Sequence, residues 1–277
     1  MALPRSLTLT AHGGAVPYYS FPALDAVPYI RHGFSTRLGG VSEGIYQSMN
    51  LSFTRGDDPV AVRRNFDRFL EAIGGKAENT VISAQTHTTS VYAVTDADRG
   101  RGVTFDRGYT DVDGLMTDRP GIVLCTQYAD CVPLFFVDLR RRVVATSHAG
   151  WRGTVDGMAQ ETVRRMGEVY GSDPADILMG IGPSIGLCCF EVDAPVYERF
   201  VALPFVDDDV IRNDGNGKYH IALWEVNRRF ALQAGVRPEH ITVTDLCTKC
   251  HPDVFWSHRV TGGERGSLAA FIGLVEE

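Results

Sequence analysis

The sequence predicts an α/β protein in which helices cover a mixed β-sheet. Short apolar, β-branched runs separated by turn residues recur between residues 81 and 148, which is typical of strands. Amphipathic segments with capping residues before and after this region predict helices. Because strands and helices mix without strict alternation, a mixed sheet is favoured over a doubly wound one.

The N-terminal region supplies an arm and the first helix. The first thirty residues alternate turn formers with short apolar pieces and predict an edge strand or arm. Asp58 is a suitable N-cap and Pro59 fits the first turn of the helix that follows. Gly74 and Gly75 end this helix. Its apolar face consists of Val62, Phe66, Phe69, Leu70 and Ile73.

The remaining elements follow in order along the chain. We expect strands at residues 81–85, 90–94, 121–126, 132–137, 143–147, 177–181, 241–244 and 267–274. We expect helices at 155–170, closed by Gly171, at 195–201, and at 223–234, closed by Gly235. Residues 207–218 are interpreted as a surface loop. Without a repeat or a linker, residues 1–277 are predicted to form one domain.

Composition excludes several classes of protein. With 27 Lys+Arg against 34 Asp+Glu, the net charge is −7, which argues against nonspecific nucleic-acid binding. No apolar run reaches the roughly 18 residues of a membrane helix. The start of the chain lacks the pattern of a signal peptide, so we expect a cytoplasmic protein with reduced cysteines. These cysteines are then metal ligands, nucleophiles or core residues.

Two histidines and one cysteine lie at the ends of predicted strands. Strand ends of one sheet can converge, which would bring His87, Cys131 and His148 together. This set suits Zn²⁺ with one open position, and the same ligands also suit copper. Cys131 acting as a nucleophile with His148 as its base is an alternative. A further alternative is that each histidine is an ordinary polar residue at a strand end and Cys131 is a thiol of the core.

Three further motifs allow more than one interpretation. The run from Cys247 through Cys250 to His251 fits c-type haem attachment, half of a zinc site, or a turn with core cysteines. Its zinc interpretation lacks a second pair with the right spacing. The glycine-rich segment 180–186 suggests an anion-binding loop or a tight turn. Arg37, beside a Gly-Gly turn, is either an anion contact or a solvated arginine.

Taken together, these motifs resemble the laccase-domain proteins, a family first labelled multicopper polyphenol oxidases and later purine nucleoside phosphorylases. The matching blocks cover nearly the whole chain in the family's order. They are Arg31-His32-Gly33-Phe34-Ser35-Thr36-Arg37, Asn50, Gln85-Thr86-His87, Asp113-Gly114-Leu115-Met116-Thr117, Ala129-Asp130-Cys131-Val132-Pro133, His148-Ala149-Gly150-Trp151-Arg152-Gly153, residues 180–191 and Phe255-Trp256-Ser257-His258-Arg259.

The resemblance implies a four-layer α/β/β/α domain with two packed β layers flanked by helices. It implies a metal site at His87, Cys131 and His148. It also implies phosphorolysis of adenosine, inosine, guanosine and methylthioadenosine, with adenosine deamination as a side activity. Two positions depart from the family pattern: Thr88 replaces a frequent glycine, and His258 replaces a tyrosine.

Within that hypothesis, each remaining polar residue receives a role. Arg37 and Arg152 are expected to bind phosphate, and Asn50 and Gln85 to orient the sugar or the base. Asp130 is expected to support the metal ligands or to carry a proton. The expected partners are purine nucleosides and phosphate, without nucleic acid or membrane, for a monomer or homodimer.

Three rival functions remain open at this stage. A copper phenol oxidase would need a multicopper array, for which three ligands do not suffice. A hydrolase that edits peptidoglycan precursors by cleaving an amide would use the same metal and thiol. A binding protein with a vestigial metal site gives no reason for three convergent ligands.

Overall fold

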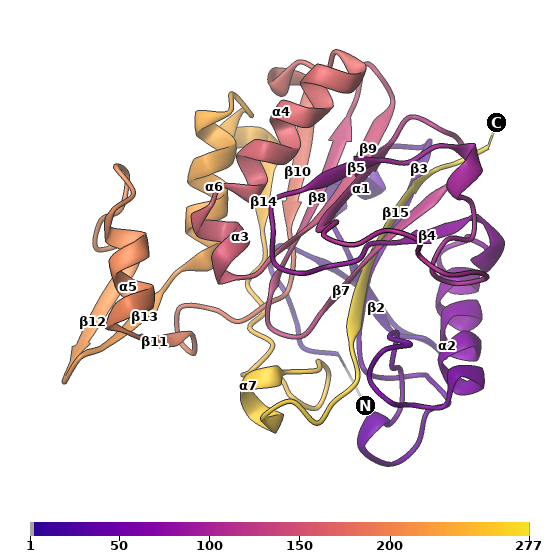
Figure 1. Cartoon of the computed structure of the whole chain (residues 1–277), viewed down its shortest axis with the longest axis horizontal. Helices are drawn as coiled ribbons and strands as arrows, with labels where there is room; N and C mark the ends of the chain where they lie inside the picture. Colours follow the sequence, from indigo (N-terminus) through magenta and orange to yellow (C-terminus); the bar gives the residue numbers. More distant parts are fainter. Residues whose placement is uncertain (1–2, 277) are drawn as a thin grey trace.

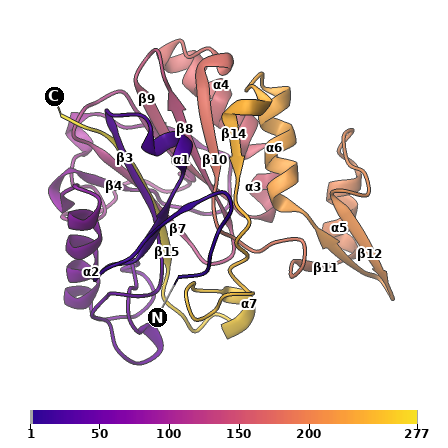
Figure 2. The ribbon, with the colours of Figure 1, turned by 180° about the vertical axis from the view of Figure 1, so that it is seen from behind.

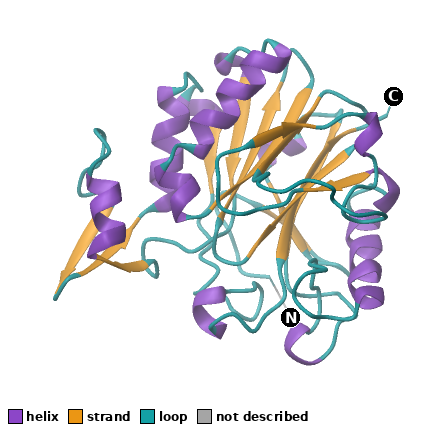
Figure 3. Ribbon diagram, viewed as in Figure 1, coloured by secondary structure: helices purple, strands orange, loops and turns teal. Residues whose placement is uncertain are grey.

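The computed structural model describes residues 3–276 and arranges them in four layers, with two β-sheets packed face to face between helices (Figure 1). The view from behind shows the same layers (Figure 2), and Figure 3 separates helices from strands. The predicted mixed α/β class and its two packed β layers are confirmed. Among the described residues, no helix is both long and apolar enough to span a membrane.

The strands form two sheets of six strands and a small third sheet. The first sheet has the order β1 (Thr10–His12), β2 (Tyr18–Ser20), β3 (Ile30–Ser35), β15 (Leu268–Leu274), β7 (Val123–Tyr128) and β4 (Thr80–Ile82). The second has the order β14 (Ile241–Val243), β10 (Ile177–Ile181), β8 (Val132–Asp138), β9 (Val143–Ala149), β6 (Gly114–Thr117) and β5 (Val91–Ala93). The third consists of β11 (Glu191–Asp193), β13 (Lys218–Ile221) and β12 (Ile211–Gly215).

The α-helices are distributed over both outer faces and the loops. They are α1 (Pro22–Asp25), α2 (Pro59–Ala72), α3 (Trp151–Val155), α4 (Met158–Tyr170), α5 (Ala194–Val201), α6 (Leu223–Gln233) and α7 (His258–Thr261). α2 packs on the outer face of the first sheet, where Phe66 and Phe69 contact Phe271. α4 and α6 cover the outer face of the second sheet.

Alternation along β8 explains how one buried strand serves two cores. Phe135 and Val137 face the core between the two sheets, whereas Leu134 and Phe136 face the core beneath α4 and α6. Successive side chains of a strand point to opposite faces, so a strand covered on both sides is a continuous apolar run. The apolar run predicted at 132–137 therefore marks a central strand.

Two of the predicted segments take a different form in the structure. The helix expected at 155–170 begins only at Met158 as α4, because Gly157 takes a left-handed conformation with φ of +80° and separates it from the short helix α3 before it. Residues 207–218 are not a plain loop, because β12 lies there and pairs with β13 as a hairpin. Its strand carries mostly exposed polar residues, which hid it from a search for apolar alternation. This small sheet and α5 project from one side of the molecule (Figure 1).

Candidate active site

The pairing of β8 with β9 brings a cysteine and a histidine together. The register places Pro133 opposite His148 and Val132 opposite Ala149, so Cys131 lies at the start of one strand beside the end of the other. Because neighbouring antiparallel strands run in opposite directions, Cys131 and His148, 17 positions apart in sequence, meet at the same end of the sheet. The predicted convergence of Cys131 and His148 follows from this register.

Asp113 brings the third residue, His87, into place. In the sequence, Asp113 was noted only as part of the block 113–117. Its carboxylate is fully buried and accepts the backbone N–H groups of Thr86, His87 and Thr88 at 3.0, 3.1 and 2.9 Å. The Thr88 hydroxyl donates to the same carboxylate at 3.0 Å. Asp113 Oδ1 also pairs with His148 Nδ1 at 2.8 Å. One carboxylate therefore holds the segment carrying His87 and orients His148.

The three side chains form a compact ligand set. Their ligand atoms all lie within 4.8 Å of one another, and the rings of His87 and His148 are 5.0 Å apart and nearly perpendicular. Because the Nδ1 atom of His148 pairs with Asp113, its Nε2 atom is left for a ligand, which is the usual arrangement of a metal-bound histidine. The donor set therefore fits Zn²⁺ or copper.

The backbone around the cluster is shaped to admit these side chains. His87 has φ of +69°, a left-handed conformation that non-glycine residues adopt rarely and that concentrates at functional sites. A Cβ atom at Gly150 would lie 2.7 Å from Cδ2 of His87 and 3.2 Å from Sγ of Cys131. Any larger residue at position 150 would displace the cluster.

Without a bound metal ion, charge interactions favour a thiolate at Cys131 beside an imidazolium at His148. Burial raises the pKa of Cys131, but His148 and His87 outweigh burial and bring the pKa below the ordinary value of a thiol. Burial lowers the pKa of His148, but the charge of Cys131 and the hydrogen bond to Asp113 raise it above its ordinary value. A thiolate is the form of cysteine that binds metals and attacks as a nucleophile.

A cavity of about 150 Å³ opens beside the cluster and is rich in arginine. His87, Cys131 and His148 lie on its wall. Its other lining residues include Arg55, Arg107 and Arg265, together with Ser52, Thr54, Gln85, Gln127 and Ser267. Three guanidinium groups with nearby hydroxyl groups form a site suited to an anion such as phosphate. None of these three arginines was predicted from the sequence, because none lies in a compact motif.

Arg265 is the most buried of these arginines. It is 6% exposed, and its Nη1 atom donates to the backbone carbonyl of Gly266 at 2.9 Å. Its Nε atom is buried and has no hydrogen-bond partner within residues 3–276. Burial, and then repulsion from Arg55, lowers the pKa of Arg265 to about 10. A buried donor without a partner is costly, so a bound anion would remove a penalty that the protein carries alone.

A second cavity of about 390 Å³ adjoins the first and is more apolar. It shares Arg55, His87, Cys131 and Arg265 with the first cavity. Its apolar side consists of Trp151, Ile185, Phe190 and Leu223. His87 and Cys131 therefore border both cavities, and the second cavity also holds His258 and Arg259 beside its apolar side.

Asp130 is held by the C-terminal part of the chain. Its Oδ1 atom accepts the hydroxyl of Thr248 at 2.6 Å, and its Oδ2 atom accepts the Ser257 hydroxyl at 3.0 Å and the Arg259 backbone N–H at 2.7 Å. Asp130 has φ of +80° and lines the second cavity. These three contacts favour a positioning role, and proton transfer by Asp130 stays a prediction.

Gln85 and Asn50 are engaged by the protein itself. The side-chain amide of Gln85 lines the first cavity, but it donates to the carbonyl of Gln127 at 2.7 Å and accepts the Gln127 N–H at 2.7 Å. Asn50 is fully buried, and its side-chain oxygen Oδ1 accepts hydrogen bonds from the backbone N–H groups of Ser52 and Ser267 at 3.1 and 2.9 Å. Asn50 lines neither of the two cavities at the cluster.

The two arginines expected to bind phosphate lie outside both cavity walls. Arg37 stacks over Trp256 at 3.8 Å and donates to the carbonyls of Pro252 and Gln47 at 2.9 and 3.1 Å. Arg152 is exposed in α3 and lies over the ring of Trp151 at 4.4 Å. Their phosphate contacts stay a prediction that the observed partners do not support.

Comparisons with known proteins identify the family of the chain. The model of the multi-copper polyphenol oxidoreductase laccase family matches residues 31–275. The chain belongs to this family. Purine nucleoside phosphorylase YlmD of Bacillus subtilis (strain 168) is 36% identical over 245 residues, which cover 88% of each protein.

Two further matches widen the comparison. Adenosine deaminase RL5, from an unknown prokaryotic organism, is 37% identical over 84% of this chain and 90% of its own length. The crystal structure of the hypothetical protein YfiH of Bacillus licheniformis superimposes with a TM-score of 0.90 at 34% identity, covering 97% of this chain and 99% of that one. Two sequence relatives of this chain therefore carry names from purine nucleoside chemistry.

Proposed function

We propose that this protein is a metal-dependent purine nucleoside phosphorylase, acting on adenosine, inosine, guanosine and methylthioadenosine. The observation that carries the proposal is the group of three arginines beside the two histidines and Cys131. Phosphorolysis needs a phosphate held next to a reacting sugar, and a cationic cavity supplies that position. The name of the Bacillus subtilis relative supports the same reaction.

The metal belongs at His87, Cys131 and His148, and zinc is the ion we propose, although the same donors suit copper. A zinc ion there would supply Lewis-acid chemistry, which polarises a substrate oxygen. Asp113 keeps His148 in one orientation through the 2.8 Å contact with Nδ1. Gly150 leaves the space that these side chains need.

The arginines act on phosphate, which is the attacking group. Arg265, Arg55 and Arg107 would hold the phosphate in the first cavity with one oxygen directed at C1′ of the ribose. As that oxygen forms its bond to C1′, the bond from C1′ to the purine nitrogen breaks and its electron pair leaves with the base, which takes up a proton. The phosphate charge, fixed by the arginines, stabilises the positive charge that develops on the sugar.

The second cavity is the site that we propose for the purine. Trp151 and Phe190 provide aromatic faces on which a base can stack, and Ile185 and Leu223 complete the apolar wall. In this proposal the base and the phosphate occupy two adjoining cavities, both bordered by His87 and Cys131. Stacking would also allow several purines to bind, because it does not depend on the substituents of the ring.

Adenosine deamination is the second activity that we propose, as a side reaction. The name of the relative RL5 supports this activity. Deamination replaces the exocyclic amine of adenine by a water-derived oxygen and releases ammonia, without phosphate. The requirement for phosphate therefore separates the two reactions.

Product analysis by mass spectrometry tests both reactions. Metal-loaded protein is incubated with adenosine, with and without phosphate, beside the Cys131→Ser variant. Cys125→Ala is the matched control, since Cys125 is a thiol buried in the core between α2 and the first sheet. We expect phosphate-dependent adenine and ribose 1-phosphate from the wild-type protein and the control, and neither product from Cys131→Ser.

Other outcomes identify the rivals. Inosine formed without phosphate would make deamination the main reaction. Oxidation of a phenol that depends on copper and exceeds nucleoside turnover would contradict the phosphorylase. Absence of purine products from metal-loaded protein would also contradict it and favour cleavage of an amide.

A further inference from the structure

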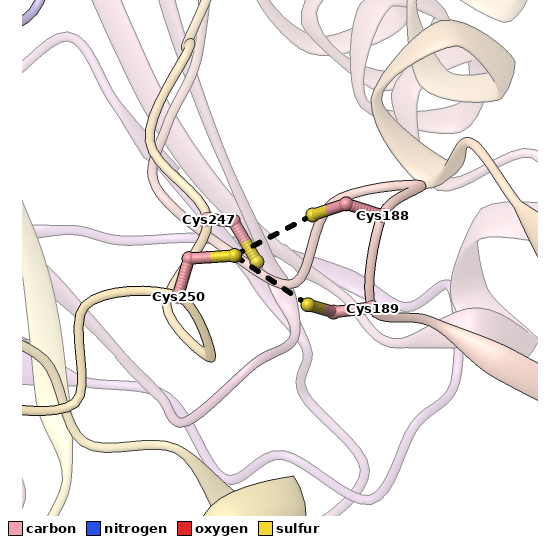
Figure 4. Close-up of side chains that lie close together, drawn as sticks. All are labelled: Cys188, Cys189, Cys247 and Cys250. Atoms are coloured by element: carbon pink, nitrogen blue, oxygen red, sulfur yellow. Dashed lines mark hydrogen bonds between the residues drawn. The ribbon is translucent and has the colours of Figure 1, made fainter.

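A second cluster of potential metal ligands lies outside the proposed active site. The Sγ atoms of Cys188, Cys189, Cys247 and Cys250 all lie within 4.8 Å of one another (Figure 4). We propose that these four cysteines bind one structural Zn²⁺ ion as thiolates. Neither the proposed phosphorolysis nor the resemblance to the family uses this site.

Two turns that are distant in sequence build the cluster. Cys188 and Cys189 lie in a turn that begins at Gly186, where the N–H groups of Cys189 and Phe190 donate to the Gly186 carbonyl at 2.9 and 3.0 Å. In an extended strand two consecutive side chains would point to opposite faces. The turn instead directs both thiols to the same side, as Figure 4 shows. This explains how an adjacent pair replaces the second spaced pair that the sequence lacks.

The other turn has the spacing of a zinc knuckle. Cys247 and Cys250 are separated by two residues, within the usual range for paired cysteine ligands. Cys247 is joined to the first segment by an isolated β-bridge to Ser184, whose carbonyl accepts the N–H of Thr248 at 3.0 Å. This backbone contact fixes the second turn against the first without help from a metal.

The distances between sulfur atoms suit tetrahedral zinc. Sγ of Cys250 lies 3.6 Å from Sγ of Cys188 and 3.5 Å from Sγ of Cys189. Zn–S bonds of about 2.3 Å in a tetrahedron place the sulfur atoms about 3.8 Å apart. All six cysteines of the chain are free thiols in the structure. The four sulfur atoms are therefore already close to the arrangement that zinc requires.

A backbone group supports the charge that the thiols acquire on binding. The N–H of Gly186 donates to Sγ of Cys247 at 3.3 Å. Such hydrogen bonds to sulfur stabilise thiolates around metals. Each thiol releases its proton to solvent, and the complex of Zn²⁺ with four thiolates carries two negative charges. Lys249 lies within the same turn and partly offsets this charge.

The position of the cluster gives the ion a structural role. The first turn lies between Ile185 and Phe190, which form part of the apolar wall of the second cavity. The second turn contains Thr248, whose hydroxyl holds Asp130 beside Cys131. A zinc ion would therefore cross-link two segments about 61 residues apart that border the proposed base site.

Zinc content measured by mass spectrometry of the purified protein tests the site. The double variant His87→Ala/His148→Ala removes the proposed active-site ion, so that any zinc retained belongs to the cysteines. We expect about one equivalent of zinc per chain in this background. Adding Cys250→Ser should reduce it to near zero, whereas adding Cys125→Ser, at a thiol outside both clusters, should leave it unchanged.

A second measurement does not require any cysteine variant to fold. Cobalt bound to the His87→Ala/His148→Ala protein should show the intense near-ultraviolet absorption of thiolate ligands and the visible bands of a tetrahedral site. Less than about 0.2 equivalent of zinc together with no such absorption would overturn the proposal. So would a disulfide among the four cysteines, seen as a mass 2 Da lower under non-reducing conditions after purification without oxidant. Both measurements are independent of nucleoside turnover, so this proposal and the phosphorylase can fail separately.

Discussion

The His87–Cys131–His148 cluster and the four-cysteine cluster use the same kinds of ligand but differ in their surroundings. The first lies at the end of two paired central strands, beside a buried carboxylate and two cavities. The second lies between two turns, and a backbone N–H supports one of its sulfur atoms. Three ligands leave a position open for substrate, whereas four thiolates fill a tetrahedron. The surroundings of the ligands therefore separate a reactive site from a structural one.

The largest effect that we expect is at the first cluster. Cys131→Ser should lower phosphate-dependent turnover of adenosine by more than about 100-fold, because changing even a partner of a metal ligand costs 10- to 100-fold. Initial rates measured after metal loading provide the check. Turnover within 3-fold of wild type would remove Cys131 from the reaction and would abolish the contrast between the clusters.

Arg265 tests whether the first cluster has an anion site beside it. Arg265→Gln should raise KM for phosphate by about 10- to 100-fold, because a charged hydrogen bond contributes about 1.5–3 kcal/mol. Steady-state kinetics at fixed nucleoside concentration measure this change. Arg63→Gln, at an exposed arginine paired with Asp67 in α2, is the matched control. An unchanged KM for phosphate in Arg265→Gln would contradict the proposed phosphate site.

A variant at Asp113 tests the role of the buried carboxylate, which only the first cluster possesses. Asp113→Asn should weaken metal affinity or activity by about 10- to 100-fold, the usual cost of changing the partner of a metal-bound histidine. The fully buried carboxylate also organises the segment 86–88, so we expect a lower melting temperature. Competition with a chelator measures the affinity. Unaltered affinity and activity would show that Asp113 serves the fold alone.

Removal of zinc from the cysteines should affect stability more than rate. With zinc at about 1,000 times its dissociation constant, binding contributes about 4 kcal/mol to the free energy of unfolding. For a chain of this size that corresponds to a melting temperature about 8 °C lower, or more, in Cys250→Ser. Calorimetry of the zinc-loaded wild-type protein and the Cys250→Ser variant measures this difference in melting temperature. A large loss of turnover with an unchanged melting temperature would make the second cluster part of the active site.

Arg37 should have the smallest effect on rate, since neither cluster uses it. Its stacking over Trp256 and its two hydrogen bonds predict that Arg37→Ala lowers the free energy of unfolding by about 1–3 kcal/mol. KM for phosphate should stay within about 3-fold of wild type. A 10-fold increase in that KM, with stability intact, would restore the sequence-based assignment of Arg37 as a phosphate contact.

Periodicity predicted most of the central fold. The strand expected at 177–181 coincides with β10, and the run expected at 132–137 agrees with β8 to within one residue. Long apolar runs are reliable because burial on both faces permits little else. β3 and β6 were not predicted, although β3 is a central strand of the first sheet. Their segments mix polar residues and glycine with apolar ones, so partners far away in sequence decide their conformation.

Sequence alone was enough to predict that His87, Cys131 and His148 meet, because all three lie at the ends of predicted strands, and the structure brings their ligand atoms within 4.8 Å of one another. The tertiary structure sets which other residues lie beside this cluster. It placed Arg55, Arg107 and Arg265 on the cavity wall, and it engaged Arg37 with Trp256. It also brought an adjacent cysteine pair to a second pair about 61 residues away. The physical reason is that the partners of a long polar side chain are set by sheet register and loop packing, which the local sequence does not encode.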